Sequence, residues 1–114
     1  MMTLKMMTLN EYQSLAQRTR NKALSPDEHL LNGCLGLAGE TGEVCDLVKK
    51  CLYQDGRDIR EKLYKELGDV LWYVAETASA MGWDLNGIAM ANIEKLQARY
   101  GDGFSPDKSL FRKE

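Results

Sequence analysis

Hydrophobic residues recur at spacings of three and four along most of the chain, the pattern of helices with one apolar face. No window shows sustained alternation of apolar and polar positions with β-branched residues, so no strand is predicted. The pattern therefore predicts an all-α fold in which four main helices form a bundle. The predicted helices cover residues 8–21, 26–53, 59–81 and 85–100.

Residues that begin and end helices support these boundaries. Thr8 with Glu11 and Ser25 with Glu28 match the capping box, in which hydroxyl and carboxylate accept hydrogen bonds from unpaired backbone N–H groups. The other predicted boundary residues are Asp58 with Glu61 and Asp84 at helix starts, and Gly82 and Gly101 at helix ends.

Length and charge restrict the class of protein. The 114 residues, with 15 basic and 17 acidic side chains, indicate one domain with a net charge of −2. This balance argues against a nucleic-acid polymer as partner, and no apolar run is long enough for a membrane span. Residues 1–7 are expected to be an extra N-terminal segment, and residues 105–114 a loose tail.

Cysteine content and chain length suggest where and how the protein works. Three cysteines without a metal-binding spacing, and no secretion signal, predict buried thiols in the cytoplasm. A chain this short buries only about two-thirds of its surface, so oligomerisation is a reasonable way to complete the core.

The second predicted helix contains acids within a glycine-rich stretch. At 100° per residue, Gly33, Gly36, Glu40 and Glu43 share one face with Leu47. Each glycine disfavours a helix interior by about 0.5–1 kcal/mol relative to alanine, so helix propensity does not explain them. Two like charges three residues apart also repel each other, and a divalent cation would reverse that effect.

The third predicted helix repeats this arrangement with Glu66 and Asp69, again beside an apolar stripe. Two carboxylate pairs on consecutive antiparallel helices can converge into one group of oxygen ligands, which favours Mg²⁺ or Mn²⁺. His29 is the only histidine, which excludes a di-iron bundle built from Glu-x-x-His motifs. An acid pair on a helix is, however, usually a solvated face.

The fourth predicted helix carries polar groups suited to phosphate oxygens. Asn92, Lys95 and Arg99 are spaced by three and four residues and share a face. An ordinary solvated basic face is the alternative interpretation.

At these positions the chain resembles the MazG-like family of all-α nucleoside triphosphate pyrophosphohydrolases, whose pattern is ExxE, a spacer, then ExxD. Here the pattern reads Glu40-Thr-Gly-Glu43, a spacer of residues 44–65, and Glu66-Leu-Gly-Asp69. Three longer segments also resemble the family: GLAGETGEVCDLVKK, KELGDVLWYVAETASAMGWDL and ANIEKLQARYGDGFS. The resemblance spans about residues 8–105.

The resemblance implies Mg²⁺-dependent hydrolysis, with Mn²⁺ as a substitute, of a nucleoside triphosphate to a monophosphate and pyrophosphate, serving to clear surplus or noncanonical nucleotides. By residue match, Glu40, Glu43, Glu66 and Asp69 would hold metal, and Glu43 is the candidate for orienting or deprotonating water. The resemblance also implies homodimers, or tetramers made of two dimers. The implied substrate-binding residues are Tyr73, Asn92, Lys95 and Arg99.

Two alternatives stay open at this stage. One is a relative dedicated to a single substrate such as dUTP, dCTP or phosphoribosyl-ATP. The other is a non-catalytic helical dimer or regulatory module, which would explain the apolar stripes but not the acids that border them.

Overall fold

A computed structural model describes residues 6–101 and 103–110, and within these ranges every regular element is helical. The all-α prediction is confirmed, with four main helices and one short additional helix. None of the helices in these ranges is both long and apolar enough to cross a membrane. The elements in chain order are α1 (Leu9–Ala16), the 3₁₀ turn η1 (Gln17–Thr19), α2 (Pro26–Lys50), the π-helical turn η2 (Cys51–Asp55), α3 (Arg60–Ala80), α4 (Leu85–Tyr100) and α5 (Pro106–Leu110).

The two predicted capping boxes are present. Thr8 Oγ1 accepts from the Glu11 N–H at 3.1 Å, and the Glu11 carboxylate accepts from the Thr8 N–H at 3.0 Å. Ser25 and Glu28 form the same reciprocal pair at 3.2 and 3.0 Å, with Pro26 at the first helical position of α2. These bonds satisfy backbone donors that a helix start otherwise leaves unpaired.

The boundaries of α3 and α4 agree with the sequence only in part. Asp84 caps α4, as predicted, and Gly82 follows α3 with a φ of 74°, a conformation that glycine adopts readily. The predicted box of Asp58 with Glu61 is wrong. Asp58 accepts from the Arg60 N–H and pairs with the Arg60 side chain, so Ile59 becomes the N-cap without a side-chain bond.

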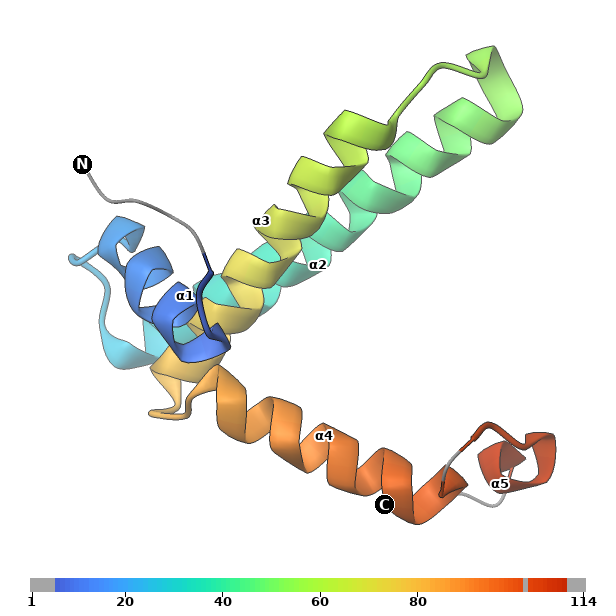
Figure 1. The fold of residues 1–114 in the computed structure, drawn as a ribbon. Helices are drawn as coiled ribbons and strands as arrows, with labels where there is room; N and C mark the ends of the chain where they lie inside the picture. The colour runs from blue at the N-terminus through green and yellow to red at the C-terminus, as the bar shows by residue number, and fades with distance from the viewer. Residues whose placement is uncertain (1–5, 102, 111–114) are drawn as a thin grey trace.

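The helices α2 and α3 form a long antiparallel hairpin that dominates the fold (Figure 1). At its far end, η2 and Gly56, with a φ of 64°, reverse the chain direction. The reversal is short, so the two helices must lie side by side along their length. Glycines on α2 make this contact close, because a Cβ added at Gly33 would lie 2.4 Å from Thr77 Oγ1, and one at Gly36 would lie 2.1 Å from the Tyr73 ring.

The helix α1 packs across the base of the hairpin through buried polar groups. The side-chain amide of Gln13 donates to Ser79 Oγ at 2.8 Å and to the Trp83 carbonyl at 3.0 Å, and its oxygen accepts from the Leu85 N–H at 2.8 Å. One glutamine therefore fixes the connection between α3 and α4. Beside it lies a small apolar core of Ala75, Ala78 and Leu85, against which Tyr12 and Val74 pack.

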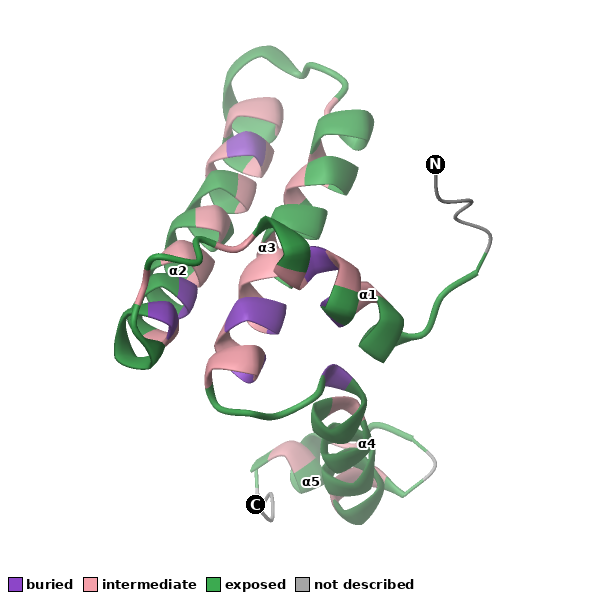
Figure 2. Ribbon diagram, turned by 90° about the vertical axis from the view of Figure 1, so that its left-hand side faces the viewer, coloured by how far each residue is buried: buried purple, intermediate pink, exposed green. Residues whose placement is uncertain are grey.

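Few of the described residues are buried, and they lie at this junction and at separate points along α2 and α3 (Figure 2). The helix α4 runs away from the hairpin and packs against α1 and α5 (Figure 1). The radius of gyration is 17.1 Å, compared with about 13 Å for a compact domain of about 100 residues. Apolar side chains of α4 that are exposed include Ile88, Met90, Ile93 and Leu96.

Within the predicted tail, residues 106–110 form the short helix α5, with Ser105 Oγ accepting from the Lys108 N–H at its start, and residues 111–114 lie outside the described ranges. One further prediction is corrected. The cysteines are not uniformly buried. Cys34 and Cys45 are exposed because they lie on the side of α2 away from α3, and only Cys51 is partly covered.

Candidate metal centre

The acidic residues of α2 and α3 meet in the middle of the hairpin. One carboxylate oxygen from each of Glu40, Glu66 and Asp69 lies within 4.8 Å of the other two. Glu40 and Glu66 are partly buried, and Asp69 is exposed. The antiparallel packing of two helices thus brings together acids that are 26 or more residues apart in the chain.

The charges in this cluster are not compensated within it. The pKa of the Glu40 carboxyl is raised, first by partial burial, then by hydrogen bonding with Glu66, and then by the negative charges of Asp69, Glu66 and Glu43. A neighbouring cation would lower this pKa instead. Hard oxygen donors with excess negative charge match the ligand preference of Mg²⁺ and Mn²⁺, so the residues present fit such an ion.

Glu43 lies next to the cluster rather than in it. Its side chain is exposed and contributes to the raised pKa of Glu40, and it lines a pocket of about 100 Å³ with Glu66. The other residues that line this pocket are Asp46, Leu47, Lys50, Arg57 and Lys62.

Three of these pocket residues are basic, and the sequence analysis did not single them out. Lys50 pairs with Asp46 at 2.7 Å, and Arg57 pairs with Asp55, which holds the pKa of that carboxyl at about 2. Lys62 lies one helical turn before Glu66. That spacing of four residues was a signal in the sequence that could have marked Lys62 as a neighbour of the acids.

Tyr12 of α1 is a further residue near the site that its sequence context did not mark. The pKa of its hydroxyl is raised, mainly by burial and in addition by the negative charge of Asp69. The helix α1, which packs against α3, therefore places Tyr12 within reach of the charge of Asp69. No short motif marks this contact, because it depends on how α1 crosses the hairpin.

Tyr73, predicted to contact substrate, lies one turn after Asp69 with its ring against Gly36. Its ring also meets Trp72 edge-on, with centroids 5.0 Å apart. The missing side chain of Gly36 is the space that the Tyr73 ring fills, which accounts for this glycine within a long helix.

The polar residues predicted on the fourth helix are not brought to the acids within one chain. Asn92, Lys95 and Arg99 lie on α4, which extends away from the hairpin (Figure 1). The Arg99 guanidinium lies 5.6 Å from the centroid of the Tyr100 ring.

The fold and the centre define a class of protein: an all-α helical hairpin with an acidic cluster across its middle. The sequence of residues 29–104 matches the MazG nucleotide pyrophosphohydrolase domain. The chain therefore belongs to the MazG family.

One curated relative is a phage protein. The chain is 42% identical over 73 residues to the gene 37 protein of Mycobacterium phage L5, a match that covers 60% of this chain and 64% of that protein. No solved structure matches the chain.

Proposed function

We propose that the protein is a Mg²⁺-dependent pyrophosphohydrolase that converts a nucleoside triphosphate and water into a nucleoside monophosphate and pyrophosphate. The observation that carries this proposal is the convergence of Glu40, Glu66 and Asp69 in a member of a nucleotide pyrophosphohydrolase family. Three uncompensated carboxylates are unfavourable in the protein alone, and a cation brought with a triphosphate would compensate them. We propose clearance of surplus or noncanonical nucleotides as the cellular role.

Glu40, Glu66 and Asp69, with Glu43 beside them, would hold the metal. When bound, Mg²⁺ neutralises charge that develops on phosphate oxygens and lowers the pKa of coordinated water. Glu43 is the candidate for orienting or deprotonating the attacking water, because it is adjacent to the three clustered acids and is not itself one of the close group.

Basic residues of the neighbouring pocket would bind the phosphates. Lys62 and Lys50 line the same pocket as Glu43 and Glu66, so a phosphate group there would lie between cations and the metal ligands. Tyr73 borders the site one turn beyond Asp69, where it would limit the space for the sugar or base.

A second copy of the chain would complete the site. The helix α4 carries Asn92, Lys95 and Arg99 away from the acids of its own chain and exposes an apolar face. Pairing of two chains would bury that face and could bring these polar groups to the partner's acidic cluster. We therefore propose a homodimer, or a tetramer of two dimers, as the active form.

The test is pyrophosphate release from a panel of nucleoside and deoxynucleoside triphosphates with Mg²⁺, with the products identified. Wild type is expected to release pyrophosphate and the monophosphate. Glu66→Gln is expected to lose at least about 100-fold in kcat/KM, because a metal-ligating charge is removed. Glu61→Gln is the matched control, since Glu61 lies on the same helix but is exposed and pairs with Lys65 at 3.3 Å.

The panel also separates the remaining alternatives. Strong preference for dUTP, dCTP or phosphoribosyl-ATP would replace the general activity with a dedicated one. If wild type and Glu66→Gln were equally inert with every nucleotide, the protein would be a non-catalytic helical module and the proposal would fail.

A further inference from the structure

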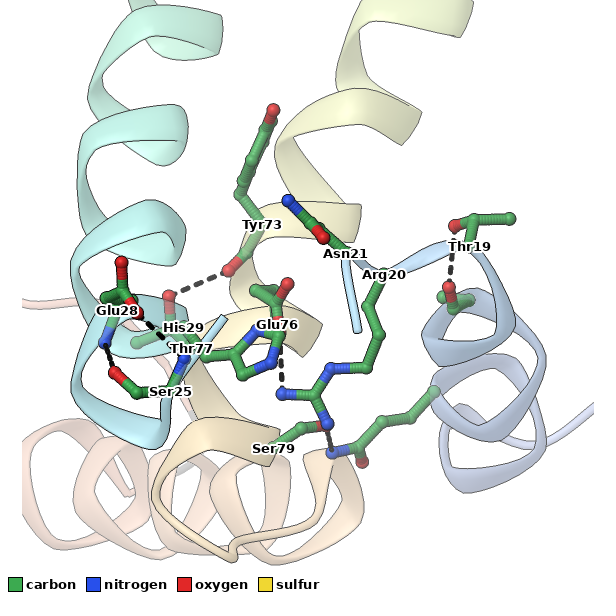
Figure 3. Close-up of polar contacts among 12 residues, drawn as sticks. Thr19, Arg20, Asn21, Ser25, Glu28, His29, Tyr73, Glu76, Thr77 and Ser79 are labelled. Carbon is green, nitrogen blue, oxygen red and sulfur yellow. Dashed lines mark hydrogen bonds and ion pairs between the residues drawn. The ribbon is translucent and has the colours of Figure 1, made fainter. Parts of the chain in front are cut away.

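The seam between α2 and α3 contains a second polar cluster, at the base of the hairpin. Glu76 of α3 is fully buried, and its Oε1 lies 3.4 Å from Arg20 Nη2 and 3.6 Å from His29 Nδ1. Figure 3 shows the His29 ring, from α2, and the Arg20 side chain, from the segment before α2, both reaching this carboxylate. Three separate segments thus meet at one acid.

This cluster is a weak source of stability. Both Glu76 oxygens, His29 Nδ1 and Arg20 Nε are buried without a hydrogen-bond partner among the described residues. Removing a carboxylate from water is expensive, and ion pairs with imperfect geometry do not fully offset this. Buried polar groups are better supported as devices that select one packing register over its alternatives.

The contacts between the two clusters show what that register controls. At the level of Glu76, Thr77 contacts Gly33, and between Glu76 and the acids, Tyr73 contacts Gly36. Because glycine has no side chain, these contacts bring the two helices close together, and Tyr73 lies between Glu76 and Asp69 on α3. Asp69 follows, about 10 Å from Glu76 at 1.5 Å per residue and on nearly the same face of α3.

We propose that Glu76 is a positioning residue that fixes the register of α3 against α2, and thereby holds Glu66 and Asp69 opposite Glu40. Glu76 can lie beside both Arg20 and His29 at only one position of α3 along α2. A shift of α3 along α2 would separate Glu76 from both partners and would carry Asp69 out of the acidic cluster. The role of that cluster in metal binding rests on the proposed function.

The experiment compares Glu76→Gln with the control Glu61→Gln in the full-length protein. The first readout is the NMR signals of the Tyr73 ring without metal, assigned by their loss in Tyr73→Phe. The second is Mn²⁺ binding by calorimetry. We expect Glu76→Gln to shift or double the Tyr73 signals and to weaken Mn²⁺ binding about tenfold, the lower end of the loss seen when groups that orient ligands are removed.

Hydrolysis provides a third readout. Since the ligands themselves are intact in Glu76→Gln, its loss of activity is expected to be recovered at high Mn²⁺ concentration, whereas Glu66→Gln stays inactive. Tyr73 signals and Mn²⁺ affinity that match those of Glu61→Gln would overturn the inference. If wild type hydrolyses no nucleotide or binds no Mn²⁺, the proposed function fails, and the Tyr73 signals alone decide the role of Glu76.

A second variant covers the case in which Glu76→Gln does not fold. The combination of Arg20→Met, His29→Leu and Glu76→Met leaves no buried charge of this cluster without its partner. Replacing a buried ion pair by apolar residues of similar volume often leaves stability unchanged or raises it. We expect this variant to keep its helical circular dichroism and lose Mn²⁺ affinity. Wild-type affinity in the folded variant would show that the register does not depend on the buried charges.

Discussion

Two polar clusters lie about two helical turns apart on the seam between α2 and α3, and they treat charge in opposite ways. The cluster of Glu40, Glu66 and Asp69 is partly exposed, contains only acids, and raises the pKa of Glu40. The cluster around Glu76 is buried and surrounds a single acid with Arg20 and His29.

The difference shows how one helix pair can divide two tasks. Like charges held in contact with solvent form an arrangement that a bound cation would complete. The buried Glu76 carboxylate already has Arg20 and His29 beside it, so this cluster is suited to fixing geometry. The contacts of Gly33 and Gly36 with α3 link the two clusters. Because a glycine has no side chain that could change rotamer, a shift at one cluster would move the other as well.

The largest expected effect is on activity when an acid of the exposed cluster is neutralised. Asp69→Asn removes one charge of the proposed metal site and should lower kcat/KM for nucleotide hydrolysis at least about 100-fold. The metal-free protein should be as stable as wild type or more stable, because repulsion with Glu40 is relieved. Steady-state kinetics and urea unfolding would measure the two effects, and a large loss of metal-free stability would show that the acids are structural.

The next effect is stabilisation by divalent cations. Mn²⁺ at about 100 times its dissociation constant should raise the free energy of unfolding by about 2.7 kcal/mol, since it binds only the folded cluster. In a thermal scan this corresponds to an increase of several degrees in Tm. Asp69→Asn should show no increase, and an equal increase in that variant would place the cation elsewhere.

The close packing of α2 against α3 beside Glu76 can be disrupted with one methyl group. In Gly33→Ala the new Cβ would lie 2.4 Å from Thr77 Oγ1 and 3.0 Å from the Thr77 backbone nitrogen, so the helices must separate. We expect a loss of about 1–3 kcal/mol in unfolding free energy.

Gly39→Ala is the matched control for this overpacking, because a Cβ there meets nothing within 4 Å. It should stabilise α2 by about 0.5–1 kcal/mol through helix propensity. Urea unfolding of both variants would measure the difference, and equal effects would show that the close helix contact at Gly33 does not matter.

The smallest effect is a pH dependence specific to Glu40. Its pKa in the folded protein is raised above the ordinary value of 4.5, so between the two values the folded state holds more protons than the unfolded state. Its contribution to stability therefore falls as pH rises through this range. Without metal, the Tm of wild type relative to Glu40→Gln should fall as the pH rises above the ordinary pKa of 4.5. A relative Tm that rises over that interval would contradict the repulsion inferred for the cluster.

Local features of the fold were readable from the sequence. The capping boxes at Thr8 and Ser25 and the cap at Asp84 were predicted because they involve residues three apart in the chain. The predicted capping box at Asp58 was wrong because the backbone N–H and the guanidinium of Arg60 donate hydrogen bonds to the Asp58 carboxylate instead. Spacing alone does not reveal which of two nearby donors an acid will accept from.

The acidic cluster was predicted in outline for a similar reason. The spacings of Glu40 with Glu43 and of Glu66 with Asp69 place each pair on one helical face, and the turn between the helices makes them antiparallel. The sequence did not reveal that Lys62 and Tyr12 lie near the acids. The position of Lys62 depends on how the pocket is formed, and that of Tyr12 on how α1 crosses the hairpin.

The sequence by itself determined the helices, most of their caps and the face on which each acid pair lies, because these follow from periodicity and from hydrogen bonds within one turn. Only the tertiary structure decided which residues meet across the seam. It placed Tyr73 against Gly36, buried Glu76 between His29 and Arg20, and directed α4 away from the acids. Those outcomes depend on the close packing of segments distant in the chain, and no local spacing encodes such contacts.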